Sequence, residues 1–205
     1  MSTPMTSRRL PLFLDLSGCI VLLVGGGRTA EAKLGPLRDA GAGIRSVALR
    51  HHQGFLREAR SRGGVDLVTG AFHPSHLEGV RLVVSATDDP EVNAQVAAEA
   101  RARGLFCNAV DDPGACDAYF AASLRRGPWH LAIGTAGGFP GLARVLREVL
   151  EELLPASHGA TLEELVALRQ RLRAELPDPG LRRQRLERLL GAFRRAYLTC
   201  GGGGA

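Results

Sequence analysis

The sequence predicts an α/β fold: a Rossmann-like, doubly wound parallel sheet, followed by a short mixed segment and a small C-terminal helical domain. Three observations predict it. Apolar runs that suit buried strands alternate with helical patterns over the first half of the chain. A glycine-rich turn follows the first of these runs. From Gly141 onward the pattern is helical.

The first half of the chain is expected to alternate strands and helices. The expected strands are residues 19–24, 44–49, 65–68, 80–85 and 105–108, and the expected helices are residues 28–40, 55–62 and 91–103. Residues 19–24 are apolar throughout, so we expect a strand buried on both faces. Asp89-Pro90 opens the last helix, and Gly41 and Gly104 are helix stops. This spacing is typical of parallel βαβ units, whose sheets bind ligands at the carboxyl ends of their strands.

The pattern changes after Asp112-Pro113-Gly114. A strand at residues 129–133 and a turn at 135–138 precede helices at 142–154, 162–176 and 181–198. We therefore expect a dinucleotide-binding Rossmann domain over residues 1–112, a linking segment over 113–154, and a helical domain over 155–205 that ends in a flexible glycine-rich tail.

Composition narrows the class of protein. The 205 residues are 45% hydrophobic, which is enough to form a core without disulfides or structural metals. No apolar run approaches the roughly 20 residues of a membrane helix, and no secretory signal is expected. The four cysteines are scattered and form no C-x-x-C pair, at Cys19, Cys107, Cys116 and Cys200. We therefore expect reduced thiols in a cytoplasmic protein, rather than a zinc module or a disulfide scaffold.

The charge is basic but diffuse. The formal net charge is +5, and Lys33 is the only lysine among the 26 basic residues. The arginine guanidinium pairs with carboxylates and phosphates through two nitrogens at once, so an arginine-rich surface suits anionic small molecules. The excess is too scattered to predict nucleic-acid binding.

The turn Gly25-Gly26-Gly27-Arg28-Thr29-Ala30 fits the pattern G-x-G-x-x-A. Gly25 permits the tight turn, Gly27 lets the backbone approach a pyrophosphate, and Ala30 is small enough for close packing of helix on sheet. The new helix directs its free N–H groups at the phosphates. The strand before the turn and the helix after it favour dinucleotide binding over a turn of purely structural role.

The end of the second strand departs from the usual NAD pattern. Val47-Ala48-Leu49-Arg50 contains no Asp or Glu to hold the ribose 2′-hydroxyl. Arg50 and Arg45 could instead favour a 2′-phosphate. The residues alone therefore leave NAD and NADP as alternatives.

Further motifs follow in a fixed order along the chain. They are Leu10-Pro-Leu-Phe13, Val24-Gly-Gly-Gly27 with Ala30-Glu-x-Lys33, Ser85-Ala-Thr-Asp-Asp89 with Val92-Asn93, Phe106-Cys-Asn-Ala-Val-Asp111, Arg126-Gly127, Thr135-Ala-Gly-Gly138 and Leu142-Ala-Arg144. As an ordered set from Leu10 to about Leu154, they resemble the precorrin-2 dehydrogenase and sirohydrochlorin ferrochelatase family, the N-terminal module of siroheme synthases. No methyltransferase domain follows, so the resemblance implies the stand-alone form.

The resemblance implies a fold, an activity and partners. The family joins a Rossmann domain to a dimerisation segment, here residues 113–154, and to a small helical domain, and it works as a homodimer. Its reaction is the NAD-dependent oxidation of precorrin-2, a tetrapyrrole, to sirohydrochlorin in siroheme biosynthesis. Some members then insert Fe(II), and the sequence does not decide whether this chain does.

The same resemblance assigns site residues. It makes Asp111 the catalytic base, with Asp112 one position away as the alternative and a turn-forming role as the competing interpretation of Asp111. The cofactor-binding residues are Gly25, Gly26, Gly27, Arg28, Thr29, Leu49, Arg50, Thr87 and Asp88. The substrate-binding residues are Asn108, Arg126 and Arg144. Helix capping is a second role for Thr87 and Asp88, and fixing a loop is one for Asn108.

No metal site is expected. His51-His52 and His73-Pro-Ser-His76 lack metal-ligand spacing, and we expect them to be surface histidines. Two segments depart from the family pattern, residues 119–122 and 136–140, and leave the shape of the substrate pocket open.

Two alternatives to the enzyme remain. The first is a nucleotide-sensing Rossmann regulatory module without catalysis, which would need a glycine turn but neither Asp111 nor the segment that ends in Leu142-Ala-Arg144. The second is a catalytically inactive scaffold that keeps the fold.

Overall fold

The computed structural model describes residues 9–110, 112–135, 139–156 and 158–199. The chain divides into two compact units. The described part of the first unit runs to Phe120, and that of the second comprises residues 121–135, 139–156 and 158–199. The predicted turn at 135–138 and the glycine-rich tail fall wholly or largely outside the described residues.

The first unit is built on a five-stranded parallel sheet. Its strands are β1 (Ile20–Val24), β2 (Gly43–Ala48), β3 (Val65–Thr69), β4 (Val80–Ser85) and β5 (Phe106–Ala109). They are ordered β3-β2-β1-β4-β5. The chain runs outward from β1 to β3 and then crosses to the other side of β1, so the topological switch lies between β1 and β4, where doubly wound sheets bind their ligands. The predicted fold class is confirmed.

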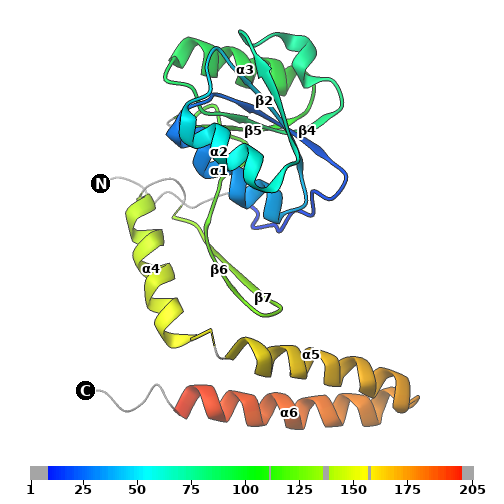
Figure 1. Cartoon of the computed structure of the whole chain (residues 1–205). Helices are drawn as coiled ribbons and strands as arrows, with labels where there is room; N and C mark the ends of the chain where they lie inside the picture. The colour runs from blue at the N-terminus through cyan, green and yellow to red at the C-terminus, as the bar shows by residue number, and fades with distance from the viewer. Residues whose placement is uncertain (1–8, 111, 136–138, 157, 200–205) are drawn as a thin grey trace, which may run out of the picture. The chain divides into compact units, whose positions relative to one another are not determined.

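Helices cover both faces of this sheet (Figure 1). The helix α1 (Arg28–Asp39) and the helix α2 (Gln53–Arg62) contribute Leu34, Leu37 and Phe55 to one apolar cluster. The helix α3 (Pro90–Ala102) and the short 3-10 helix η1 (Pro74–Leu77) lie in the cluster on the opposite face. Between them β1 is buried on both faces, as its apolar sequence predicts.

The helix ends follow the predicted signals. Asp89 Oδ1 accepts hydrogen bonds from the backbone N–H groups of Glu91, at 2.9 Å, and Val92, at 3.3 Å, at the start of α3. Pro90 occupies the first helical position, where no intrahelical N–H is needed. Gly41 and Gly104 follow α1 and α3 with φ of +84° and +67°, the left-handed conformation that glycine adopts at helix ends.

The second unit contains a hairpin and three helices. The strands β6 (Ala122–Arg126) and β7 (Trp129–Ile133) pair antiparallel. The sequence predicted β7 but missed β6, because a two-stranded ribbon shows only weak alternation of burial along ASLRR. The turn between them packs closely on the start of the helix α5 (His158–Glu175), since a Cβ on Gly127 would lie 2.6 Å from the carbonyl oxygen of Gly159.

The helices of this unit are α4 (Pro140–Leu153), α5 (His158–Glu175) and α6 (Pro179–Thr199). The helices α5 and α6 form a hairpin (Figure 1). Asp178 Oδ1 accepts hydrogen bonds from the N–H groups of Gly180 and Leu181 and so caps α6. No helix among the described residues is both long and apolar enough to cross a bilayer.

One face of α4 is apolar and exposed. Its large side chains recur at helical spacing and are between 43% and 63% exposed, at Leu142, Val145, Leu146, Val149 and Leu153. The other face carries i,i+4 ion pairs, among them Arg147 with Glu151 at 2.6 Å. This α4 stripe, as we call the five residues, is the kind of surface that monomeric proteins seldom leave uncovered.

Candidate functional site

The turn between β1 and α1 is pressed between two neighbouring loops. Gly25 has a φ of +125°, and a Cβ on it would lie 2.3 Å from the carbonyl oxygen of Ala86, just after β4. A Cβ on Gly26 would lie 2.3 Å from the carbonyl oxygen of Arg50, just after β2. Both positions therefore require glycine so that the three loops can meet at the carboxyl edge of the sheet.

Gly27 differs from these two glycines. A Cβ on Gly27 would meet nothing within 4 Å, and its backbone is extended, with a φ of −86°. It is the N-cap of α1, and no side chain accepts a hydrogen bond from the first turn. The free N–H groups and the dipole of α1 thus point into open space at the switch point, which is the arrangement that binds a phosphate.

The loop after β2 borders the same space. The backbone N–H of His52 donates to the carbonyl oxygen of Gly26 at 3.0 Å, so this loop is tied to the glycine turn. Leu49 is 78% exposed there, an apolar surface against which a base could pack, and Arg50 is exposed beside it. Arg28 and Thr29 are exposed at the start of α1. These predicted cofactor residues therefore gather around one edge.

The loop after β4 forms the other border. Thr87 Oγ1 lies 2.8 Å from Asn93 Oδ1, and Asn93 Nδ2 donates to the carbonyl oxygen of Thr87 at 3.0 Å. Ser85 Oγ also donates to Asn93 Oδ1, at 2.6 Å. Asn93 is only 8% exposed, and it fixes the shape of this loop. Its role was missed in the sequence, where its appearance in a motif gave no sign of these contacts.

Of the two acids that follow Thr87, only the second caps α3. Asp89 makes the capping hydrogen bonds, whereas Asp88 is exposed and makes none in the described part of the chain. The predicted capping role of Thr87 and Asp88 is therefore wrong. The cap falls to Asp89 because its carboxylate stands two residues before the N–H group of Glu91.

The loop after β5 carries the predicted base. Asp111 lies outside the described residues. Asp112 is described, and its Oδ1 accepts hydrogen bonds from the N–H groups of Gly114, at 3.0 Å, and Ala115, at 3.2 Å. Asp112 thus forms a turn, and its Oδ1 already accepts hydrogen bonds from the backbone.

Side chains hold this loop against the sheet. Asn108 Nδ2 donates to the carbonyl oxygen of Ala118 at 2.9 Å, which is the loop-fixing role. Cys116 Sγ donates to the carbonyl oxygen of Ala109 at 2.9 Å. Burial raises the pKa of the Cys116 thiol, and raises that of Cys107 to about 12. Both groups are therefore uncharged thiols at neutral pH and poor nucleophiles.

Lys33 adds a cation beneath this loop. Its Nζ lies 4.2 Å from the centre of the Phe120 ring, a cation–π contact. Desolvation lowers the pKa of Lys33, and the nearby Cys116 acts in the opposite direction. That the single lysine of the chain packs under the loop after β5 could not be predicted from the sequence, because Lys33 and Phe120 are far apart in it.

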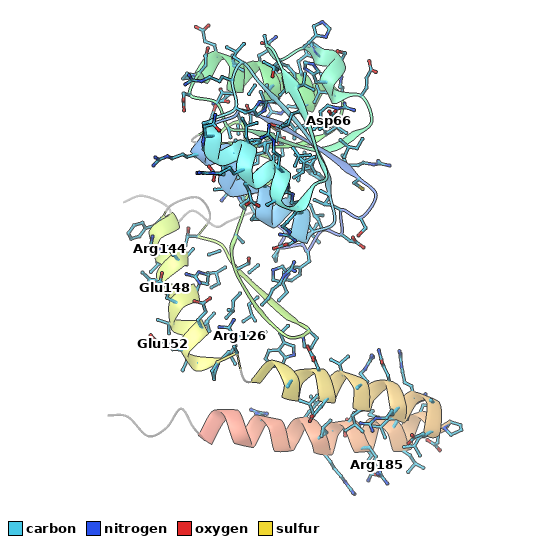
Figure 2. All side chains as sticks on the ribbon, viewed as in Figure 1. Asp66, Arg126, Arg144, Glu148, Glu152 and Arg185 are labelled. Atoms are coloured by element: carbon cyan, nitrogen blue, oxygen red, sulfur yellow. The ribbon has the colours of Figure 1, made fainter. Side chains whose placement is uncertain are left out.

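The predicted substrate arginines lie in the second unit, and both already make polar contacts within the chain. Arg126 donates through Nε to the carbonyl oxygen of Leu154 and through Nη1 to that of Arg125. Arg144 is exposed and pairs with Glu148 on the same helix at 3.3 Å (Figure 2). Both side chains make intramolecular contacts, and their role toward a substrate stays a prediction.

The histidines are not all surface residues. His51 is 9% exposed and its Nε2 lies 3.0 Å from Ser46 Oγ. His52 Nδ1 accepts hydrogen bonds from the N–H groups of Gly54 and Phe55 and caps α2. The expectation of a surface histidine is wrong for His51, because the turn into α2 buries its ring, whereas His52 is partly exposed. Among the described residues, no three His, Cys, Asp or Glu side chains gather as metal ligands.

Arg45 is unavailable at the carboxyl edge. Its guanidinium donates to the carbonyl oxygens of His76, at 2.9 Å, and Glu78, at 3.1 Å. Its predicted alternative role toward a 2′-phosphate is therefore wrong, because these bonds hold the side chain against the segment that leads into β4.

Comparison with known proteins gives one family and a set of relatives. Residues 12–122 match the model of a family described as putative NAD(P)-binding. The siroheme synthase of Methylococcus capsulatus is 43% identical over 182 residues, which are 88% of this chain and 38% of that protein. Siroheme synthase 1 of Aeromonas salmonicida is 44% identical over 185 residues, 90% of this chain and 39% of that protein. The chain thus spans about two fifths of the length of these relatives.

A solved structure shares the whole fold. The protein "SirC, precorrin-2 dehydrogenase" superposes with a TM-score of 0.76 at 24% identity, over 93% of this chain and 98% of that one. The likeness covers both units and supports the assignment of a Rossmann-like domain followed by a hairpin and helices.

Proposed function

The chain belongs to the putative NAD(P)-binding family, and from that premise we propose that it catalyses the NAD-dependent dehydrogenation of precorrin-2 to sirohydrochlorin in siroheme biosynthesis. The observation that carries the proposal is the open glycine turn at the switch point, in a chain 43–44% identical to siroheme synthases. The reaction moves a hydride to a dinucleotide and a proton to the protein.

The residues around the glycine turn fit a dinucleotide. Gly25 and Gly26 bring the three loops together, and the N–H groups that follow Gly27 would hold the pyrophosphate. Arg28 and Thr29 would contact it from the start of α1. On the β2 side, Leu49 and Arg50 would face the adenosine, and on the β4 side, Thr87 and Asp88 would lie along the nicotinamide half. When bound, NAD supplies the hydride acceptor.

Asp111 is our candidate for the base that takes the proton. The hydrogen bonds of Asp112 support this choice, because they commit the neighbouring carboxylate to the turn. Asn108, Arg126 and Arg144 are the proposed substrate contacts. Arginine suits a tetrapyrrole that carries several carboxylates, because its guanidinium pairs with both carboxylate oxygens.

The experiment is spectroscopic. The purified chain, NAD and precorrin-2 should produce the sirohydrochlorin absorption together with NADH, and omission of NAD should abolish both signals. Failure to form either product from active substrate would favour the alternative, a nucleotide-sensing Rossmann module without catalysis. Insertion of Fe(II) is a second proposed step, and siroheme formation from sirohydrochlorin and Fe(II), with and without the chain, tests it separately.

We also propose a homodimer in which a second copy covers the α4 stripe. Five apolar side chains exposed along one helix face support it. The change Val149→Glu should shift the chain from dimer to monomer in light scattering, because the stripe would then bury a charge. Glu148→Gln, on the polar face, is the control. A wild-type chain that is monomeric at micromolar concentration would reject the proposal.

The three described free thiols support a cytoplasmic location.

A further inference from the structure

The first unit contains a hollow of about 560 Å³ between the start of α1 and the start of α2. Arg28, Glu31 and Ala32 line it from α1, and His52, Gly54 and Arg57 from the α2 side. The hollow adjoins the glycine turn, because the N–H of Glu31 donates to the carbonyl oxygen of Gly27 at 3.0 Å. The Glu31 side chain therefore emerges one turn beyond the proposed pyrophosphate site.

His52 orients the carboxylate of Glu31. Because His52 Nδ1 accepts two backbone hydrogen bonds, the proton of the neutral ring is on Nε2. Nε2 lies 2.9 Å from Glu31 Oε2, although the pair does not form an aligned hydrogen bond. The contact is electrostatic, and the carboxylate keeps the capacity to accept hydrogen bonds from a ligand.

Gly54 makes room for this pair. A Cβ on Gly54 would lie 2.7 Å from Glu31 Oε2, 3.1 Å from Glu31 Oε1 and 2.7 Å from His52 Cε1. His52 and Gly54, both at the start of α2, therefore lie against the carboxylate of Glu31, beside the loop after β2. In other dinucleotide folds that loop supplies the acid for the ribose, and here it has none.

We propose that Glu31 is the residue that selects NAD over NADP. Its carboxylate accepts a hydrogen bond from the 2′-hydroxyl of the adenosine ribose and repels a 2′-phosphate. His52 and Gly54 are positioning residues that hold it there. This inference rests on the proposed function, in which a dinucleotide binds at the glycine turn.

Arg28 and Arg57 determine what loss of the Glu31 carboxylate would do to cofactor preference. Both guanidinium groups line the hollow and are exposed, and neither pairs with a carboxylate among the described residues. Within the part of the chain that the structure describes, Glu31 is the only acid that lines the hollow. Without it, the two arginines would face a 2′-phosphate unopposed. Loss of the carboxylate should therefore weaken NAD and strengthen NADP.

The test is calorimetric binding of NAD and of NADP to the full chain, without substrate. Wild type should bind NAD more tightly. Glu31→Ala should weaken NAD about tenfold, the cost of a lost hydrogen bond to a charged group, and tighten NADP by a similar factor. Gly54→Ala, which leaves Glu31 in the sequence but displaces its carboxylate, should change the ratio in the same direction by less.

Asp39→Asn is the matched control. It removes another contact between α1 and α2, the ion pair of Asp39 with Arg62 at 2.8 Å, which lies outside the hollow, and it should leave the ratio unchanged. If Glu31→Ala lowers the melting temperature but leaves the ratio of NAD to NADP affinity unchanged, the contact between Glu31 and His52 serves only the fold, and the inference is overturned. A wild type that prefers NADP, or binds both alike, would overturn it too. A wild type that binds neither would contradict the proposed function itself.

Discussion

The residues predicted to bind cofactor and those predicted to bind substrate differ in how the protein already uses them. On the cofactor side, Gly27 faces open space and Leu49 is 78% exposed. On the substrate side, Asn108 and Arg126 both donate to backbone carbonyl oxygens. The comparison shows that a motif built from backbone geometry indicates its binding role directly. A polar side chain at a motif position can instead serve to hold the fold together.

The largest expected effect separates the two acids after β5. Asp111→Asn should lower turnover by about 10² to 10⁴, the usual contribution of a general base, and leave NAD affinity unchanged. Asp112→Asn should leave turnover within a small factor of wild type and stability nearly unchanged, because the amide oxygen of asparagine accepts the same two backbone hydrogen bonds. Steady-state kinetics with calorimetric NAD binding makes the measurement. Full activity of Asp111→Asn would reject it as the base.

The second prediction concerns the glycine turn. Gly27→Val should keep the fold, since its Cβ would meet nothing within 4 Å, but should weaken NAD at least tenfold by filling the space of the pyrophosphate. Gly35→Ala, also with open space around its Cβ and inside α1, is the control for a changed helix. Gly26→Ala should instead destabilise the fold, because its Cβ would collide with the backbone of Arg50. Unchanged NAD affinity in a folded Gly27→Val protein would contradict the cofactor site.

These glycines also show what the sequence can predict. The strand, the turn and the helix are local in the chain, so the pattern G-x-G-x-x-A and its context predict a turn at Gly25 and Gly27. The convergence of Glu31, His52 and Gly54 could not be predicted in this way, because it depends on how α1 packs beside α2, about twenty residues further along. The strand β6 was missed for a related reason: a lone hairpin leaves little periodicity in its sequence.

The third prediction tests whether Arg126 serves the fold or a substrate. Arg126→Gln should lower the free energy of unfolding by about 1 to 2 kcal/mol, because it breaks a partly buried hydrogen bond to the carbonyl oxygen of Leu154 and an exposed one to that of Arg125. Arg144→Gln should cost about 0.3 to 0.5 kcal/mol, the worth of an exposed i,i+4 pair. Urea titration followed by circular dichroism gives both values. If stability is unchanged and the KM for precorrin-2 rises, Arg126 binds substrate and does not stabilise the fold.

The smallest effect belongs to His51, which lies under the cofactor edge. Burial lowers the pKa of His51 below its usual 6.5, so the unfolded chain takes up this proton first as the pH falls. Stability is therefore full above about pH 6.5 and decreases as the pH falls through the lowered pKa. His51→Gln keeps a partner for Ser46 Oγ but cannot titrate. The difference between the two melting curves, recorded from pH 8 to pH 5, isolates the histidine from His76, whose pKa is also lowered. Parallel curves would mean that the ring stays accessible to protons in the folded state, and that the loop after β2 is less tightly packed than the rest of the cofactor edge.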